Sequence, residues 1–250
     1  MSGLAVSGLL SLLFLTSEPP AKSFLYEPAF VLDKQLRCPA APYELQPGDI
    51  CFAVNNHTFS KIGHHLSGAG LPNHSMIVFA QPDGRMAIVE AGPHSELKIA
   101  AIDALEHLQS YEDEGSRVWV RRRKTPLTPE QSACLTSYCL TLPERRFAIK
   151  RLAAQLSPFR SRFPLRTAVV GKSDLDRSNF FCSELVLNAL IAAGVFEPGS
   201  QRPAASYPSD LFYGHSSNIF VNRGVRLINC DWEPPARWTG CPSRCETTCK

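Results

Sequence analysis

A hairpin in the first half of the chain constrains the fold most, because it fixes which side chains share a face of the sheet. Two apolar runs, residues 74–80 and 85–91, flank the segment Gln81-Pro82-Asp83-Gly84. Proline suits the first position of a turn and glycine suits a left-handed last position. The sequence therefore predicts two antiparallel strands joined by a three-residue loop, with Met76 opposite Glu90.

This register places Glu90 beside His74. His74 then lies opposite Gly92, and Glu90 is its diagonal neighbour on the same face, about 7–8 Å away between backbones. A glutamate spans that gap and holds an imidazole in one orientation. A shift of one residue would move Glu90 to the other face. The alternatives are that Glu90 is a solvent-facing strand end and that His74 is a satisfied histidine at a strand edge.

A helix predicted for residues 179–193 and closed by Gly194 carries Cys182 in its first turn. Unpaired backbone N–H groups at a helix start and a nearby imidazolium both lower the pKa of a thiol. The same N–H groups can stabilise an oxyanion. Cys182 is therefore a candidate nucleophile and His74 its candidate base. The alternative is that Cys182 is a small buried hydrophobic residue.

The remaining pattern indicates an α+β domain. Pro47-Gly48-Asp49 is a turn that leads into a strand over residues 50–54, and further strands are predicted for residues 117–123 and near 225–229. Residues 24–44 read as a connecting segment. Thr128-Pro129-Glu130-Gln131 opens a helix. The stripe that this helix is expected to bury consists of Cys134, Leu135, Tyr138, Cys139 and Leu142.

Residues 1–23 have the features of a signal peptide. A short apolar run from Leu4 to Leu15 precedes Ala21-Lys22-Ser23, a small-x-small cleavage site, although no Lys or Arg comes before the run. We therefore expect export to the periplasm or the medium, or membrane association through an uncleaved N-terminal segment. A wrongly assigned start and a buried or interfacial helix are the alternatives. The net charge of +3 does not indicate a nucleic-acid partner.

Nine cysteines are many for a reducing compartment. Cys230, Cys241, Cys245 and Cys249 gather in residues 230–250, which we interpret as a cysteine-bearing tail. A disulfide-pinned or disordered tail is favoured over a zinc site, because the spacing is not that of a zinc knuckle. The predicted chemistry requires no metal or organic cofactor.

A basic stretch covers residues 144–166. The favoured interpretation is a solvated face, and the alternative is a patch for an anionic substrate, a cell-wall polymer or a membrane surface. Glu184 is interpreted as a helix-start charge rather than an acid catalyst. Adjacent His64 and His65 could be metal ligands or an alternative base, but a surface-loop location is favoured. The other four histidines show no partner pattern that supports a catalytic or metal-binding role: His57, His94, His107 and His215.

Three segments in this order resemble the circularly permuted NlpC-like, papain-fold cysteine amidases. They are Leu45-Gln46-Pro47-Gly48-Asp49-Ile50, then Asn73-His74-Ser75-Met76-Ile77-Val78 with Val89-Glu90-Ala91, and then Phe180-Phe181-Cys182-Ser183-Glu184-Leu185-Val186. The histidine precedes the cysteine, as in the permuted group. The resemblance runs from about residue 43 to 213 and includes Pro208-Ser209-Asp210-Leu211.

The resemblance implies a permuted papain-like domain over residues 24–229, with a small antiparallel sheet packed against the cysteine-bearing helix. It implies Cys182 as nucleophile, His74 as base and Glu90 as the orienting residue. The implied activity is hydrolysis of an amide, either a peptide or an isopeptide bond. The implied substrate is a peptide, a cell-wall component or a lipid-linked amide. The alternatives are a lipid acyltransferase or phospholipase of the related permuted fold, and a binding module without catalysis.

Overall fold

The computed structural model describes residues 23–29, 31–54, 70–92, 97–154, 164–169, 171–216, 218–222 and 231–241. Some of the predicted features fall outside these residues: the leader up to residue 22, the strand near 225–229, the histidines at 57, 64, 65 and 94, and the cysteines at 230, 245 and 249. None of the described helices is both long enough and apolar enough to cross a lipid bilayer.

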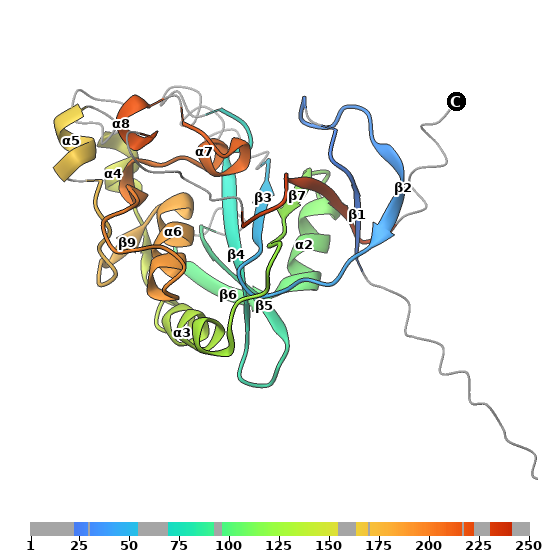
Figure 1. Cartoon of the computed structure of the whole chain (residues 1–250), viewed down its shortest axis with the longest axis horizontal. Coiled ribbons are helices and arrows are strands. Elements are labelled where there is room, and N and C mark those ends of the chain that lie inside the picture. Colours follow the sequence, from blue (N-terminus) through green and yellow to red (C-terminus); the bar gives the residue numbers. More distant parts are fainter. Residues whose placement is uncertain are drawn as a thin grey trace, which may run out of the picture.

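Eight strands form one sheet in the order β2-β1-β10-β7-β3-β4-β5-β6 (Figure 1), and all neighbouring strands pair antiparallel. The strands are β1 (Phe24–Glu27), β2 (Arg37–Pro42), β3 (Ile50–Ala53), β4 (His74–Ala80), β5 (Met86–Ala91), β6 (Ile99–Asp103), β7 (Val118–Arg121) and β10 (Ala236–Thr239). The sheet is larger than the small sheet that the resemblance implies. Residues 24–44 supply β1 and β2 rather than a connection, and β10 comes from the segment interpreted as a tail.

The register of the β4–β5 hairpin is the one that the sequence predicts. Ile77 pairs with Val89 and Val78 with Ile88. The loop is closed by a hydrogen bond from the Gln81 N–H to the Arg85 carbonyl at 2.8 Å. The predicted alternation of faces therefore holds along both strands.

Helices cover both faces of the sheet (Figure 1). α3 (Pro129–Leu140) and α6 (Cys182–Ala192) pack on one face of β4, and α2 (Ala104–Asp113) packs against β5, β6 and β7 on the other. The shorter helices are α4 (Ile149–Ala154), α5 (Pro164–Val169), α7 (Pro208–Tyr213), α8 (Ile219–Asn222) and the 3-10 helix η2 (Pro203–Ala205).

Strand β4 is buried on both faces and so contributes to two cores. Ile77 and Phe79 belong to the core beneath α3 and α6, whereas Met76 and Val78 belong to the core beneath α2. Successive side chains of a strand point to opposite faces, which explains this division. A residue at the end of β4 therefore lies near both layers.

The two predicted helices form with small differences. Thr128 and Gln131 make the predicted capping box at the start of α3. The helix buries Leu135 and Cys139, but Cys134 is exposed, contrary to prediction, because it lies about 100° round the helix from Leu135. Tyr138 is half-buried.

α6 begins at Cys182 rather than at residue 179, because Asn179–Phe180 forms the short strand β9. This strand pairs parallel with β8 (Arg146–Phe147). Phe181 is extended, with φ −82° and ψ 160°, and the helix follows it directly. Gly194 adopts a φ of +68° just beyond the helix, as its role in closing the helix requires.

The Pro-Gly-Asp turn has a structural role. The buried Asp49 carboxylate accepts hydrogen bonds from the backbone N–H groups of Gln46 and Arg123 and from the Tyr43 hydroxyl. Gly48 has a φ of +89°, and a Cβ there would lie 2.8 Å from the Arg123 Cδ. The turn thereby fastens the start of β3 to the end of β7.

Candidate active site

Cys182 is the first residue of α6 and is buried, with 5% of its surface exposed. Two residues later, Glu184 accepts a hydrogen bond from the Phe181 N–H at 3.1 Å. The Arg151 Nη2 donates to both Glu184 oxygens, at 2.8 and 2.9 Å. Glu184 therefore acts as a helix-start charge, already fully bonded, and it fixes the backbone that presents the Cys182 thiol.

His74 is the first residue of β4, and its imidazole bridges the cysteine and a carboxylate. The Nε2 atom lies 2.6 Å from the Glu90 Oε2. The ring also makes a hydrogen bond with the Cys182 thiol. Because Nε2 faces Glu90, Nδ1 is the nitrogen available to the thiol. The structure therefore brings the three predicted residues, Cys182, His74 and Glu90, into one hydrogen-bonded line.

Glu90 is completely buried and has three side-chain partners. Besides His74, it contacts the His107 Nε2 through Oε1 at 2.6 Å and accepts a hydrogen bond from the Tyr111 hydroxyl at 3.3 Å. The two aromatic rings of α2 also meet edge to face, with centroids 5.1 Å apart. Both carboxylate oxygens are thus held, which fixes the position of the group that orients His74.

Sequence reasoning missed His107 and Tyr111 because it did not predict α2. A signal was present. Asp103 caps the helix by accepting from the N–H groups of Leu105 and Glu106, and Asp followed three residues later by Glu is a helix-start pattern. A helix starting there places His107 and Tyr111, four residues apart, on one face.

The charged forms of Cys182, His74 and Glu90 stabilise one another. Burial disfavours a charged His74, but the Glu90 carboxylate and the Cys182 thiolate outweigh burial and raise the pKa of His74. Burial likewise disfavours a charged Glu90, but His74 and His107 outweigh it and hold the pKa of this carboxyl below its usual value. Burial also disfavours the Cys182 thiolate, yet His74 and Ser75 lower the pKa of the thiol. The arrangement favours a thiolate–imidazolium pair.

Ser75 lies directly beside the thiol. It follows His74 on β4, so its side chain points to the opposite face, toward α6. Its backbone N–H favours the Cys182 thiolate. The Ser75 side chain is completely buried, so water does not compete for the sulfur from this side.

The basic stretch is only partly a solvated face. The Arg145 guanidinium donates to the carbonyls of Thr141, Leu175 and Arg177, and Arg151 binds Glu184 as described above. Arg146 and Lys150 are exposed. Some arginines of this stretch therefore hold the segment before α6 in place. Residues 155–163 and the Arg166 side chain lie outside the described part.

The five cysteines whose state is described are free thiols: Cys51, Cys134, Cys139, Cys182 and Cys241. Among the described residues, no three His, Cys, Asp or Glu side chains are grouped so as to hold a metal ion. His215 is exposed, and its ring contacts the Tyr213 carbonyl. It lies outside the line formed by Cys182, His74 and Glu90.

Comparisons with known proteins give a likeness to solved structures only. No protein-family model matches the chain, and no curated protein matches it. Among solved structures, the chain is similar to the crystal structure of the metalloprotein YiiX from Escherichia coli O157:H7, a DUF1105 protein. The sequences are 16% identical, the alignment covers 72% of this chain and 87% of that chain, and the TM-score is 0.43. The chemistry of the site follows from its own geometry.

Proposed function

We propose that this protein is a cysteine hydrolase of amide bonds, with Cys182 as nucleophile, His74 as general base and acid, and Glu90 as the orienting residue. One observation carries the proposal: the His74 imidazole is hydrogen-bonded to the Cys182 thiol on one side and to the buried Glu90 carboxylate on the other. A nucleophile, its base and a group that orients the base are what covalent acyl transfer requires.

The mechanism follows from these positions. The Cys182 thiolate attacks the substrate carbonyl carbon, and the oxyanion forms near the N–H groups at the start of α6. The His74 imidazolium then gives its proton to the departing amine, which leaves a thioester on Cys182. His74, now neutral, takes a proton from water as the water attacks the thioester. The carboxylic acid departs, and the thiolate–imidazolium pair is restored.

Two further features support this proposal. The sequence resembles permuted NlpC-like, papain-fold amidases in three segments, and these segments supply the Pro-Gly-Asp turn, the β4–β5 hairpin and the start of α6. The cysteine-bearing helix packs against an antiparallel sheet, as that resemblance implies. We propose cell-wall peptide amides as the first substrates to screen, because residues 1–23 predict export.

Labelling with a thiol-directed acyl probe tests the nucleophile. We expect the wild-type protein to be labelled and Cys182→Ala to lose labelling, whereas Cys134→Ala and Cys241→Ala, which remove exposed thiols, retain it. Labelling that survives Cys182→Ala would refute the assignment of the nucleophile.

A substrate screen then tests the reaction. We expect turnover of peptide or isopeptide amides by the wild-type protein and none by His74→Ala. Turnover of lipid esters in the absence of any amide turnover would replace this proposal with a lipid acyltransferase or phospholipase. Labelling of Cys182 without turnover of either class would point to the non-catalytic alternative.

A further inference from the structure

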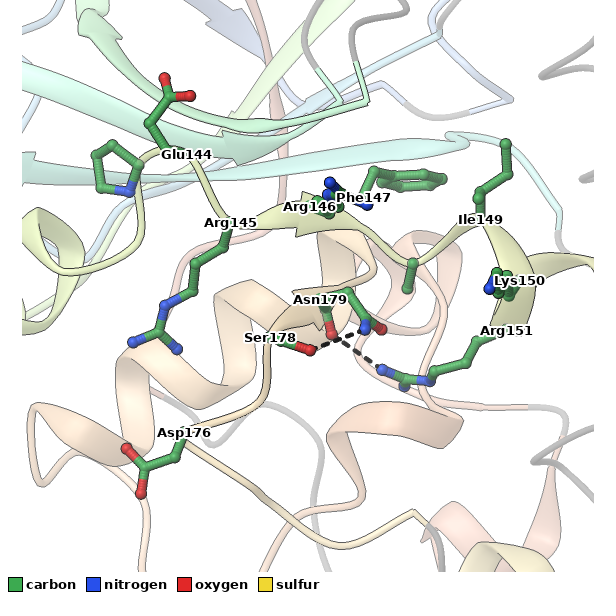
Figure 2. A pocket seen from close by; sticks show the side chains of 12 residues that line it. Glu144, Arg145, Arg146, Phe147, Ile149, Lys150, Arg151, Asp176, Ser178 and Asn179 are labelled. Atoms are coloured by element: carbon green, nitrogen blue, oxygen red, sulfur yellow. Dashed lines mark hydrogen bonds between the residues drawn. The ribbon is translucent and has the colours of Figure 1, made fainter.

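A groove lies beside the segment that leads into Cys182. It has a volume of about 1030 Å³ and is formed by residues around β8 and β9 and the start of α4 (Figure 2). Polar and charged side chains make up most of its lining: Glu144, Arg145, Arg146, Lys150, Arg151, Asp176, Ser178 and Asn179. A volume of this size accommodates several residues of a peptide, since ligand pockets commonly measure about 300–1,000 Å³.

The charges in this lining do not cancel within the described residues. Glu144 is ion-paired with Lys98 at 2.8 Å, outside the lining, and Arg151 is ion-paired with Glu184. Arg145 donates to backbone carbonyls only. Three cationic side chains of the lining therefore face a single remaining carboxylate, that of Asp176. These cations are Arg145 and the exposed Arg146 and Lys150. The groove therefore has a surplus of positive charge, and the charged groups that produce it are accessible.

The groove borders the segment that leads into the nucleophile. β8 runs parallel to β9, and β9 is separated from Cys182 only by Phe181. The Arg151 guanidinium lies 4.6 Å from the centre of the Phe181 ring, and Phe147 meets the same ring at 6.3 Å. In Figure 2, Lys150 and Arg151 lie toward one end of the groove, and Glu144 and Asp176 toward the other. Because Arg151 contacts Phe181, the end with Lys150 is the end nearer Cys182.

We propose that this groove binds an acidic segment of a peptide substrate, with Arg146 and Lys150 contacting its carboxylates. The inference rests on the proposed function, because it assigns a substrate class to that site. Cationic side chains pair favourably with carboxylates. Polar groups at Ser178 and Asn179 suit a peptide backbone. Four lining residues are apolar, Pro143, Phe147, Ala148 and Ile149, and the exposed charges of Arg146 and Lys150 favour an acidic peptide over a neutral acyl chain.

Binding to the full-length Cys182→Ala protein tests this directly, without requiring turnover. The probes are a blocked tetrapeptide with two central glutamates and its isostere with two central glutamines, measured by calorimetry. We expect the glutamate peptide to bind at least about tenfold more tightly than the glutamine peptide. We expect added salt to reduce that preference. Adding Arg146→Gln and Lys150→Gln should remove the preference.

The matched control is Arg122→Gln with Lys124→Gln, which removes the same charges from exposed residues that do not line the groove. We expect it to change the affinity for the glutamate peptide less than twofold. Equal affinity for the two peptides, no measurable binding of the glutamate peptide, or equal losses in the two double variants would overturn the proposal. Binding of phosphatidylglycerol vesicles that is lost only in the groove variant, without a peptide preference, would overturn it in favour of a membrane surface.

These results are separate from those that test the proposed function. If the protein binds the acidic peptide but is not labelled at Cys182, the proposed peptide-binding groove is supported and the proposed catalytic function is refuted. If the protein is labelled at Cys182 but does not distinguish the two peptides, the proposed nucleophile is supported and the proposed acidic substrate class is refuted.

Discussion

Replacement of Glu90 by glutamine tests the hydrogen-bonded line at its buried end. Glutamine has the same shape, so the side chain still fills the site between β5 and α2, but the negative charge that favours the His74 imidazolium is lost. A hydrogen bond to a charged group contributes about 1.5–3 kcal/mol. Loss of that amount lowers the pKa of His74 by about one to two units. The equilibrium between thiolate–imidazolium and thiol–imidazole then shifts about 10- to 100-fold toward the neutral pair.

The assay is the rate of probe labelling at Cys182 as a function of pH. We expect labelling of Glu90→Gln to fall by about tenfold or more near neutral pH. The deficit should shrink at alkaline pH, because Cys182 then ionises without the help of His74. The matched control is Asp83→Asn, which makes the same carboxylate-to-amide change at the exposed tip of the same hairpin. It should label at the wild-type rate.

Wild-type labelling rates for Glu90→Gln across the pH range would refute the reasoning, since the carboxylate would then have no influence on the thiolate. An equal deficit at every pH would also refute it, because that result indicates a displaced residue rather than a changed equilibrium.

The same variant has a consequence for stability. The pKa of Glu90 is lower in the folded protein than its usual value, so its contribution to stability is present above the usual carboxyl pKa and is lost as the pH falls toward the folded-state pKa. Urea unfolding should therefore show a smaller loss of stability on acidification for Glu90→Gln than for the wild type. An identical acid dependence would contradict the lowered pKa.

Two other predictions concern a positioning residue and a turn. His107→Phe fills the same space but removes a donor to Glu90, so we expect about 1–3 kcal/mol lower stability in urea and labelling that declines at a higher pH on acidification than in the wild type. The control His215→Phe, at an exposed histidine, should change neither the stability nor the pH dependence of labelling. An unchanged pH dependence of labelling for His107→Phe would show that His107 has a purely structural role. Gly48→Ala, at φ +89° with a clash against neighbouring side chains, should destabilise the protein by more than Gly84→Ala, at φ +85° in open space. Equal losses in unfolding experiments would show that the close packing around Gly48 contributes nothing.

The parts of the fold that depend on neighbouring residues could be predicted from the sequence. The β4–β5 register follows from alternating apolar residues and a short turn, and the start of α3 follows from Thr128 and Pro129. Both signals lie within a few residues of the structure that they produce. Because the predicted register is correct, the hairpin pattern alone is enough to pair Glu90 with His74.

The parts that depend on distant segments could not be predicted in the same way. β10 pairs with β1 and β7, which come from far earlier in the chain, and a four-residue strand gives little pattern of its own. The predicted start of α6 is wrong because β9 exists only through its pairing with β8. The proximity of Cys182 to His74 is inferred from the order of motifs in a resembling family, and no local pattern indicates it.

The line of Cys182, His74 and Glu90 draws on both layers that cover the sheet, since the thiol comes from α6 and the donors that hold the carboxylate come from α2. In a chain where either helix has come away from the sheet, the cysteine is an ordinary, mostly protonated thiol at neutral pH. The enhanced reactivity of Cys182 is therefore acquired late, when both helices have packed on the sheet. For the same reason, the fraction of molecules that react rapidly at Cys182 counts the completely assembled ones, a quantity that helix content measured by circular dichroism does not give.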